Sequence, residues 1–481
     1  MERMMVMNKY FRLIFMFVIA LLLHACGIPD MNTKKEDTTL PEQFKSDQTS
    51  KTNAANIKWK DFFEDKNLVK LIDVAVANNK DINILLQRIG AAENEIQARR
   101  GAYLPFVKGG GGASGYKLGQ YTEGGAVEQN LPIGGGPFPT FVGDYQFGLF
   151  STWEVDIWRK LRNSTEVAVL EYMSTIEGKN FLITNLVAEV ARAYYELITL
   201  DNQLENLEQN IAIQENALEM IRTLQLYAKT DSLAVKRYEA EVAKNQSKRP
   251  ELKQAIIVTE NKLNFLLGRT PQPIKRTVNG FLQIDPKMLS TGIPSQLLEN
   301  RPDIKQAEFE IAAAQLNIEV ARAEFLPTFG IRAGLGFDAF AMKYLINTPA
   351  SLAALVAGEL VAPLINKKAI TAQFKNANLK QIESAYEYEK RIINAYVEVA
   401  NQIANMDNMH RSFDIKQKQV EYIVKSIDIS IQLFKSARVH YLDVLTTQRD
   451  ALDAKRELIE TKQKQIFAMI DLYKSLGGGW Q

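Results

Sequence analysis

The sequence predicts a mainly α-helical chain with a membrane β-barrel, built from an internally duplicated long-helix fold and four strands per protomer. Three observations predict this fold class. The two halves of the chain align with each other. Apolar residues keep a coiled-coil spacing over long stretches of both halves. Short segments of alternating apolar and polar residues stand where the helical period stops.

Residues 1–25 have the pattern of a secretory signal peptide. Lys9 and Arg12 precede an apolar run that ends at Ala25. The run is too short to span a bilayer, which distinguishes it from a transmembrane helix. The sequence therefore predicts a protein that leaves the cytoplasm.

Cys26 follows the signal peptide and is the only cysteine in 481 residues, which rules out an internal disulfide. Residues 23–27, Leu-His-Ala-Cys-Gly, resemble a bacterial lipobox, in which the cysteine is acylated, although His24 departs from the usual small or aliphatic residue. The alternative is an ordinary small residue at the end of a signal. We expect lipidation at Cys26 and a polar, lipid-anchored flexible tether over residues 26–56.

Charge and hydropathy narrow the possible partners and membrane contacts. The formal net charge of +2 gives no bulk electrostatic reason to expect nucleic-acid binding. Beyond the signal peptide, no apolar stretch is long enough for a transmembrane helix. A membrane crossing would therefore need a closed β-barrel.

The mature chain consists of two repeats, 57–270 and 294–481, joined by a linker over residues 271–293. Asp81 matches Asp303 at a separation of 222 residues, whereas Ala193 matches Ala395 at a separation of 202. The first repeat therefore holds 20 additional residues, which we place in a Gly- and Pro-rich loop over 124–139.

Each repeat contains a long apolar seam with alternating spacings of four and three residues, which is typical of coiled coils. The first seam comprises Leu186, Val190, Ala193, Leu197, Leu200, Leu204, Leu207 and Ile211. The second comprises Ile392, Tyr396, Val399, Ile403, Met406, His410 and Phe413, continued by Val420, Val424, Ile427 and Ile431. An unbroken helix from about residue 161 to 227 would be roughly 100 Å long, which suits a shaft that spans the periplasm.

Four strands are predicted, at about 104–118, 144–158, 326–340 and 351–365. From Tyr145 to Ile157 and from Thr328 to Asp338, apolar and polar residues alternate, as in transmembrane barrel strands. A half-buried sheet in a soluble domain has the same alternation. Because the smallest barrels need about eight strands, four strands in one chain indicate oligomerisation.

Several strings of the sequence resemble the TolC-like outer-membrane efflux lipoproteins, which are the NodT-type outer-membrane factors of resistance-nodulation-division tripartite pumps. The resemblance covers nearly the whole mature chain. It is carried by Trp59, Phe62, Asp65, Leu68, Leu71, Ile72, Asn79, Asp81 and Ile82, by residues 153–158 (Trp-Glu-Val-Asp-Ile-Trp), by residues 300–304 (Asn-Arg-Pro-Asp-Ile) and by residues 476–480 (Leu-Gly-Gly-Gly-Trp).

The resemblance implies a homotrimer with a twelve-stranded outer-membrane barrel and a twelve-helix periplasmic α-barrel. It also implies a periplasmic adaptor (membrane fusion protein) and an inner-membrane resistance-nodulation-division pump as partners. The expected function is conduction, and the inner pump largely selects the substrate, whether drug, metal ion, bile-type amphiphile or peptide.

In this family a ring of acidic residues closes the periplasmic end near a Leu-Asp-Val-Leu-type segment, which here is residues 442–445. Three copies of Asp443 would form an anionic ring that favours cations. Thr446 stands where some relatives have a second acid. Lys229 and Arg438 occupy equivalent repeat positions and could pair with this ring, or they could be ordinary helix-end cations. The alternative for Asp443 is a solvated surface aspartate.

The adaptor is expected to grip the two helix turns at the periplasmic tip. Ala228 and Ala437 stand where relatives usually have glycine, the residue that most readily ends a helix in the left-handed conformation. The expected contact residues are Tyr227, Ala228, Thr230, Asp231, Ala437, Val439 and His440.

Two other classes of protein fit the sequence less well. An enzyme is disfavoured because the chain has three histidines and one cysteine, His410 lies on a seam, and His440 has no nearby Cys or second His; no cofactor or metal is expected. The glycines at 109–112 are not followed by the Lys-Ser or Lys-Thr of a phosphate loop. A lipid-tethered periplasmic coiled-coil structural or adhesive protein would explain the seams, but not the strands.

Overall fold

The computed structural model describes residues 28–44, 53–133, 136–227, 229–286, 289–436 and 438–481. Cys26, Ala228 and Ala437 lie outside these ranges. The chain divides into two compact units. Unit 1 comprises residues 1–35, 90–172 and 309–385, and unit 2 comprises residues 36–89, 173–308 and 386–481.

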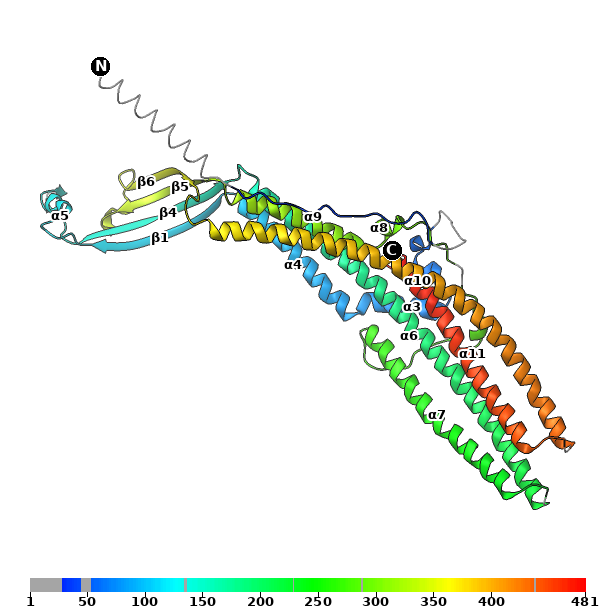
Figure 1. Cartoon of the computed structure of the whole chain (residues 1–481). Coiled ribbons are helices and arrows are strands. Elements are labelled where there is room, and N and C mark those ends of the chain that lie inside the picture. The colour runs from blue at the N-terminus through cyan, green and yellow to red at the C-terminus, as the bar shows by residue number, and fades with distance from the viewer. Residues whose placement is uncertain (1–27, 45–52, 134–135, 228, 287–288, 437) are drawn as a thin grey trace. The chain divides into compact units, whose positions relative to one another are not determined.

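The element order confirms the internal duplication (Figure 1). In the first repeat the main elements are α3 (Lys66–Asn78), α4 (Lys80–Tyr103), β1 (Phe106–Tyr116), β4 (Val142–Val155), α6 (Lys160–Leu226) and α7 (Ser232–Leu266). In the second they are α8 (Gln296–Asn300), α9 (Pro302–Ala323), β5 (Thr328–Ala339), β6 (Leu352–Val361), α10 (Lys368–Lys435) and α11 (Tyr441–Ser475). The long helices α6 and α10 contain 67 and 68 residues, and α7 and α11 contain 35 each.

Short elements complete the described chain: η1 (Ala54–Asn56), α2 (Trp59–Phe62), η2 (Phe281–Gln283) and η3 (Met342–Tyr344). None of the helices in the described ranges has both the length and the apolar character needed to cross a bilayer.

Unit 1 contains a four-stranded antiparallel sheet in the order β1-β4-β5-β6. The stretch predicted as a loop carries a short helix, α5 (Glu123–Glu128), and a small hairpin of β2 (Pro132–Ile133) with β3 (Gly136–Pro137). The side chain of Thr122 begins α5 by accepting a hydrogen bond from the Gly125 amide at 3.1 Å.

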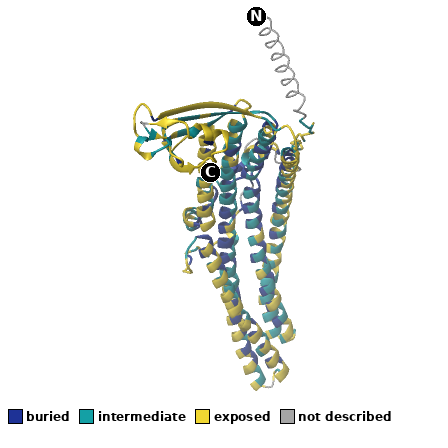
Figure 2. Cartoon of the chain, turned by 90° about the vertical axis from the view of Figure 1, so that its left-hand side faces the viewer, coloured by how far each residue is buried: buried dark blue, intermediate teal, exposed yellow. Residues whose placement is uncertain are grey.

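The core of unit 2 contains residues of both seams that the sequence predicts, but the second seam is not buried throughout, because His410 is exposed and Val420, Val424, Ile427 and Ile431 are half-buried. Val190, Ala193, Leu197, Ile392 and Val399 are buried in one apolar cluster. Spacings of three and four residues place these side chains on one face of each helix, where they pack against the other helices. Figure 2 shows buried residues along the middle of the helices and exposed residues over much of the sheet.

The two repeats use equivalent joints between a helix start and a helix end. In the first, the side-chain amide of Asn79 donates a hydrogen bond to the carbonyl of Leu266 at 3.0 Å. In the second, Arg301 donates to the carbonyl of Ser475 at 2.9 Å. Gly268 and Gly477, which follow these helix ends, have φ of +67° and +95°, a conformation that favours glycine.

Residues 28–44 are bound along α10, which differs from the flexible tether that their polar composition predicts. The backbone N–H of Lys34 donates to the Gln381 side chain at 3.0 Å, and the Gln381 amide donates back to the Lys34 carbonyl at 2.6 Å. Further along, Phe44 stacks on Tyr396 with ring centroids 5.5 Å apart. A buried glutamine can thus hold an extended polar segment through its backbone.

Candidate functional site

The strand register sorts the side chains of the sheet onto two chemically different faces. Residues paired across neighbouring strands point to the same side, and successive residues along one strand alternate between sides. One side, the apolar face, carries Tyr145, Phe147, Leu149, Trp153, Val155, Phe329, Ile331, Leu335, Phe337, Leu352, Val356 and Leu360. The other, the polar face, carries Lys108, Asp144, Gln146, Thr152, Glu154, Thr328, Arg332, Asp338 and Glu359 among glycines and a few apolar residues.

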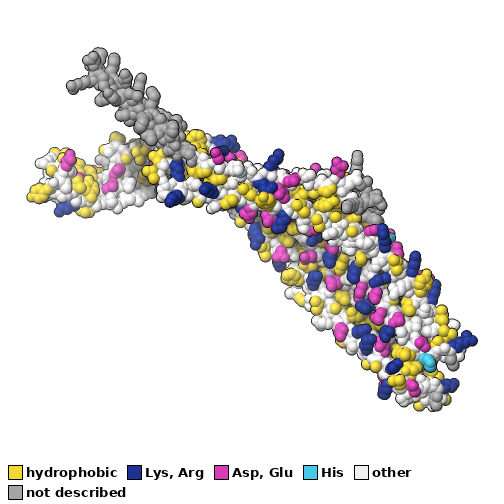
Figure 3. Space-filling model, in the orientation of Figure 1, with side chains coloured by type: hydrophobic (Ala, Val, Ile, Leu, Met, Phe, Trp, Pro, Cys, Tyr) yellow, Lys and Arg dark blue, Asp and Glu magenta, His cyan; other side chains and the backbone are white. Residues whose placement is uncertain are grey.

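No other described element covers much of the apolar face, and several of its side chains are strongly exposed. Phe147, Val356 and Leu360 are 61%, 81% and 63% exposed. Contiguous exposed apolar area of this kind marks a surface that contacts lipid or another protein. In Figure 3, Lys, Arg, Asp and Glu side chains are dense over the helices and sparse over the sheet.

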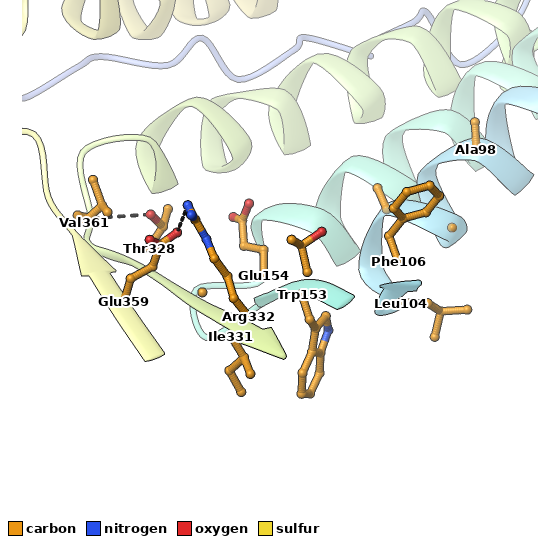
Figure 4. Close-up of a pocket in the computed structure, with 14 residues that line it drawn as sticks. Ala98, Leu104, Phe106, Trp153, Glu154, Thr328, Ile331, Arg332, Glu359 and Val361 are labelled. Atoms are coloured by element: carbon orange, nitrogen blue, oxygen red, sulfur yellow. Dashed lines mark hydrogen bonds and ion pairs between the residues drawn. The ribbon is translucent and has the colours of Figure 1, made fainter. Parts of the chain in front are cut away.

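A cavity of about 600 Å³ lies at the end of the sheet where β1 begins and β6 ends. Figure 4 shows Arg332, Glu154 and Glu359 pointing to one side of the strands, and Trp153 and Ile331 to the other. Arg332 pairs with Glu359 on the adjacent strand at 2.9 Å. Glu154 pairs with Lys160 at the start of α6 at 2.6 Å. This end of the polar face is therefore charged.

Midway along the strands, the polar face has one row almost without side chains. Gly110 pairs with Gly148, Gly148 with Gly336, and Gly336 with Ala353. A Cβ added at Gly148 would lie 2.7 Å from the Cα of Gly336, so this close approach of two strands requires glycine. The polar face is therefore almost free of side chains at this level.

In unit 2, the long helices α6 and α10 end in equivalent turns. The amide of Lys229 donates to the carbonyl of Leu224, and the amide of Arg438 donates to the carbonyl of Leu433, both at 2.9 Å. Such a bond across six residues belongs to the Schellman helix ending. Asp231 is the N-cap of α7, because its carboxylate accepts a hydrogen bond from the backbone amide of Ala234 at 2.9 Å.

One small apolar cluster packs α6, α7 and α11 together beside these turns. It contains Leu218, Ile221, Ala234, Val235, Tyr238, Val242 and Leu445. On its outside, Arg222 and Lys236 each approach Glu239 at 2.8 Å, and their hydrogen bonds hold the pKa of this carboxyl below its usual range. α6 and α7 are thereby held together just above their turn.

The expected contact residues sit on or beside these turns. Tyr227 and the neighbouring Leu226 are strongly exposed, and Asp231 and His440 are also exposed. Thr230 and Val439 are half-buried. Unpaired aromatic and aliphatic side chains at a helix end are well suited to a protein contact.

Asp443 is exposed in the first turn of α11 and caps this helix, because its carboxylate accepts the His440 amide at 2.9 Å. Within the described part of the single chain, it forms no ion pair with Lys229 or Arg438. The capping bond engages one of the two carboxylate oxygens.

The sequence pattern does not identify Lys108 or Glu359 as site residues. Lys108 lies in a glycine-rich strand without alternation, and Glu359 lies in a strand that is apolar on both sides. Only the strand register reveals that both belong to the charged end of the polar face.

Comparison with known proteins gives a consistent result over most of the chain. A model of the outer membrane efflux protein family matches residues 71–269 and 293–478. The chain is 26% identical over 471 residues to the cation efflux system protein CusC of Escherichia coli O6:H1, covering 97% of this chain and 98% of CusC. It is 25% identical over 453 residues to the probable outer membrane lipoprotein SilC of Salmonella typhimurium, covering 92% and 93%.

Among solved structures, the open state of the MtrE outer membrane channel of Neisseria gonorrhoeae matches with a TM-score of 0.81. The match covers 94% of this chain and 98% of MtrE at 22% sequence identity, and it supports the fold.

Proposed function

The chain belongs to the outer membrane efflux protein family, and from this premise we propose that three copies form the outer-membrane channel of a tripartite efflux system. The observation that carries the proposal is the four-stranded sheet with an uncovered apolar face. Within the described residues, β1 and β6 each pair with one strand only. Unpaired edges cannot face lipid, so copies must join edge to edge. Three copies supply twelve strands, above the minimum of about eight for a closed barrel.

The helices of unit 2 supply a second line of support. α10 carries exposed apolar residues on a side other than its buried seam: Tyr386, Ile393, Ile415, Tyr422 and Ile429. Within this set the spacing of seven residues recurs, as on a helix that packs against a parallel or antiparallel neighbour. Neighbouring copies would cover this stripe in the α-barrel.

In the assembled channel, the apolar face would contact lipid and the polar face would line the lumen. The bare row at Gly148 and Gly336 would be the widest level of this lumen. Substrate would enter from the periplasmic side, driven by a resistance-nodulation-division pump in the inner membrane, and leave to the exterior. The channel itself would perform no chemistry.

The periplasmic end would be closed by the helix tips, with Asp443 of each copy contributing to an anionic ring. Two such carboxylates brought close together repel each other, so the ring favours cations and resists tight closure. A periplasmic adaptor that binds the exposed turns at Tyr227 and His440 would bias the packing of the tip helices between closed and open arrangements.

Acylation of Cys26 would anchor each copy to the outer membrane. The lipobox-like residues 23–27 support this proposal, and the relative SilC is named as an outer membrane lipoprotein. A lipid chain adds membrane affinity through its buried methylene groups, in addition to that of the strands.

Conductance tests the proposal. Purified protein added to a planar lipid bilayer is expected to give discrete current steps of uniform size and a reversal potential that indicates cation preference. A lipid-tethered coiled-coil protein would bind the membrane without conducting. Absence of current steps from protein that has inserted into the bilayer would overturn the channel.

A further inference from the structure

The two free edges of the sheet match each other in length, direction and charge. β1 contains 11 residues and β6 contains 10, and they run antiparallel. Lys108 is the only charged residue of β1, and Glu359 is the only charged residue of β6. Lys108 is the third residue from the start of its strand, and Glu359 is the third from the end of its own. Both lie on the polar face, at the same end of the sheet.

We propose that Lys108 of one copy pairs with Glu359 of the neighbouring copy and fixes the register of the seam between subunits. The inference rests on the trimer proposed above and names the contact that joins its copies. In one chain the two strands are separated by β4 and β5, about 14 Å in all, so this pair can form only between copies.

The pairing of the polar faces restricts the register of the seam to steps of two residues. With the edges flush, Phe106 lies opposite Val361, and Lys108 lies opposite Glu359. A shift of two residues along the strands places Lys108 diagonally across from Glu359, at about 7–8 Å between Cα atoms, which long side chains can bridge.

Barrel geometry selects these two registers. The row Lys108, Phe150, Gly334, Leu355 runs across one subunit. In the flush register it continues at Gly112 of the next copy, which is four residues further along β1. Three subunits then give a shear of about twelve residues for twelve strands and a tilt of about 35°. The register shifted by two residues in the direction that raises the shear gives a tilt of about 46°. The usual tilt of about 35–45° lies between them, and both bring Lys108 beside Glu359.

The local charges favour the same pairing. Glu359 already accepts a hydrogen bond from Arg332 at 2.9 Å, and a carboxylate has further acceptor positions for a second cation. In the described part of the chain, no ion pair or hydrogen bond involves the Lys108 ammonium, which is exposed. The completed cluster Arg332–Glu359–Lys108 would occur three times around the lumen and oppose slippage, since any larger shift leaves Lys108 beyond the reach of Glu359.

Crosslinking tests the contact. In the chain carrying both Lys108→Cys and Glu359→Cys, a short thiol crosslinker that spans about 5–8 Å should link copies into covalent dimers and trimers. The matched control combines Lys108→Cys with Ala353→Cys, which lies on the same face of β6 but six residues away, and should give at least tenfold less product. Protein without added cysteines reports any reaction of Cys26.

Charge reversal provides the second measurement. Lys108→Glu alone should lower the temperature at which the trimer dissociates in detergent, and Lys108→Glu combined with Glu359→Lys should restore part of the loss. Lys117→Glu, just beyond β1, should have little effect.

The outcomes separate this inference from the trimer. Intact trimers with no crosslink above the Ala353 control, or with no recovery in the double reversal, would overturn the Lys108–Glu359 contact and leave the channel standing. Absence of trimers in the unmodified protein would overturn the proposed function.

Discussion

At the scale of single residues, Asp443 combines two roles that a substitution can separate. Asparagine keeps an oxygen that can accept the His440 amide, but it removes the negative charge. We predict that Asp443→Asn retains folding and loses most of the cation preference, measured as a shift of the reversal potential toward zero in asymmetric salt. Asp428→Asn on α10 is the matched control and should leave the potential unchanged. An unaltered potential in Asp443→Asn would place the constriction elsewhere.

Arg301 stabilises the fold, and its replacement should lower the free energy of unfolding. It is 5% exposed and donates to Asp303 at 2.7 Å, to Glu398 at 2.8 Å and to the Ser475 carbonyl. Arg301→Ala leaves two carboxylates without this partner, and breaking a buried pair costs about 3–5 kcal/mol. The expected result is a clearly lower urea midpoint.

An exposed arginine provides the comparison for Arg301. Arg99 pairs with Glu95 at 2.7 Å on the surface of α4, where such a pair contributes about 0.5 kcal/mol or less. Arg99→Ala should therefore shift the urea midpoint far less than Arg301→Ala. Equal shifts would show that the joint around Arg301 does not stabilise the helices as described.

At the scale of elements, the glycine row is a steric requirement of the β4–β5 pair. Gly148→Ala would bring a Cβ to 2.7 Å from the Cα of Gly336, so the strands must separate. We predict a several-fold lower yield of assembled trimer, measured by size-exclusion chromatography in detergent. Gly109→Ala is the control, because its Cβ would meet only a Leu149 methyl at an ordinary 3.8 Å. Equal yields would argue against a close approach at this row.

The periodic elements were predictable, because their side chains repeat with the period of the structure that buries them. The seam around Val190 and Ile392 and the alternation around Phe147 and Ile331 fall on helices and strands as expected. β1 shows no alternation, because glycines replace the side chains that would reveal it. Its place in the sheet is set by pairing with β4, which is a tertiary contact.

The candidate site was predictable only where one segment defines it. The turns at Lys229 and Arg438 are expected from the resemblance of their own segments to the family, although alanine stands where the helix-ending pattern has glycine. The binding of residues 28–44 by Gln381 and the meeting of Arg332 with Glu359 depend on residues far apart in the chain. Composition alone therefore predicts a free tether. It gives no indication of the charged end of the polar face.

At the scale of the whole molecule, the sheet is complete only in an assembly of several copies. A single chain leaves two strand edges unpaired and the apolar face uncovered in the part that the structure describes. A ring of copies would pair the strand edges, whose backbone groups would be costly to leave unpaired in lipid, and the lipid itself would cover the apolar face. The exposed stripe on α10 requires neighbours on the helices as well.

The number of chains in the membrane-extracted protein is therefore the most direct test. Native mass spectrometry of the full chain, purified from outer membranes in mild detergent, should give three chain masses and retain them on dilution. A mass of one chain that persists across detergents and protein concentrations would contradict the account.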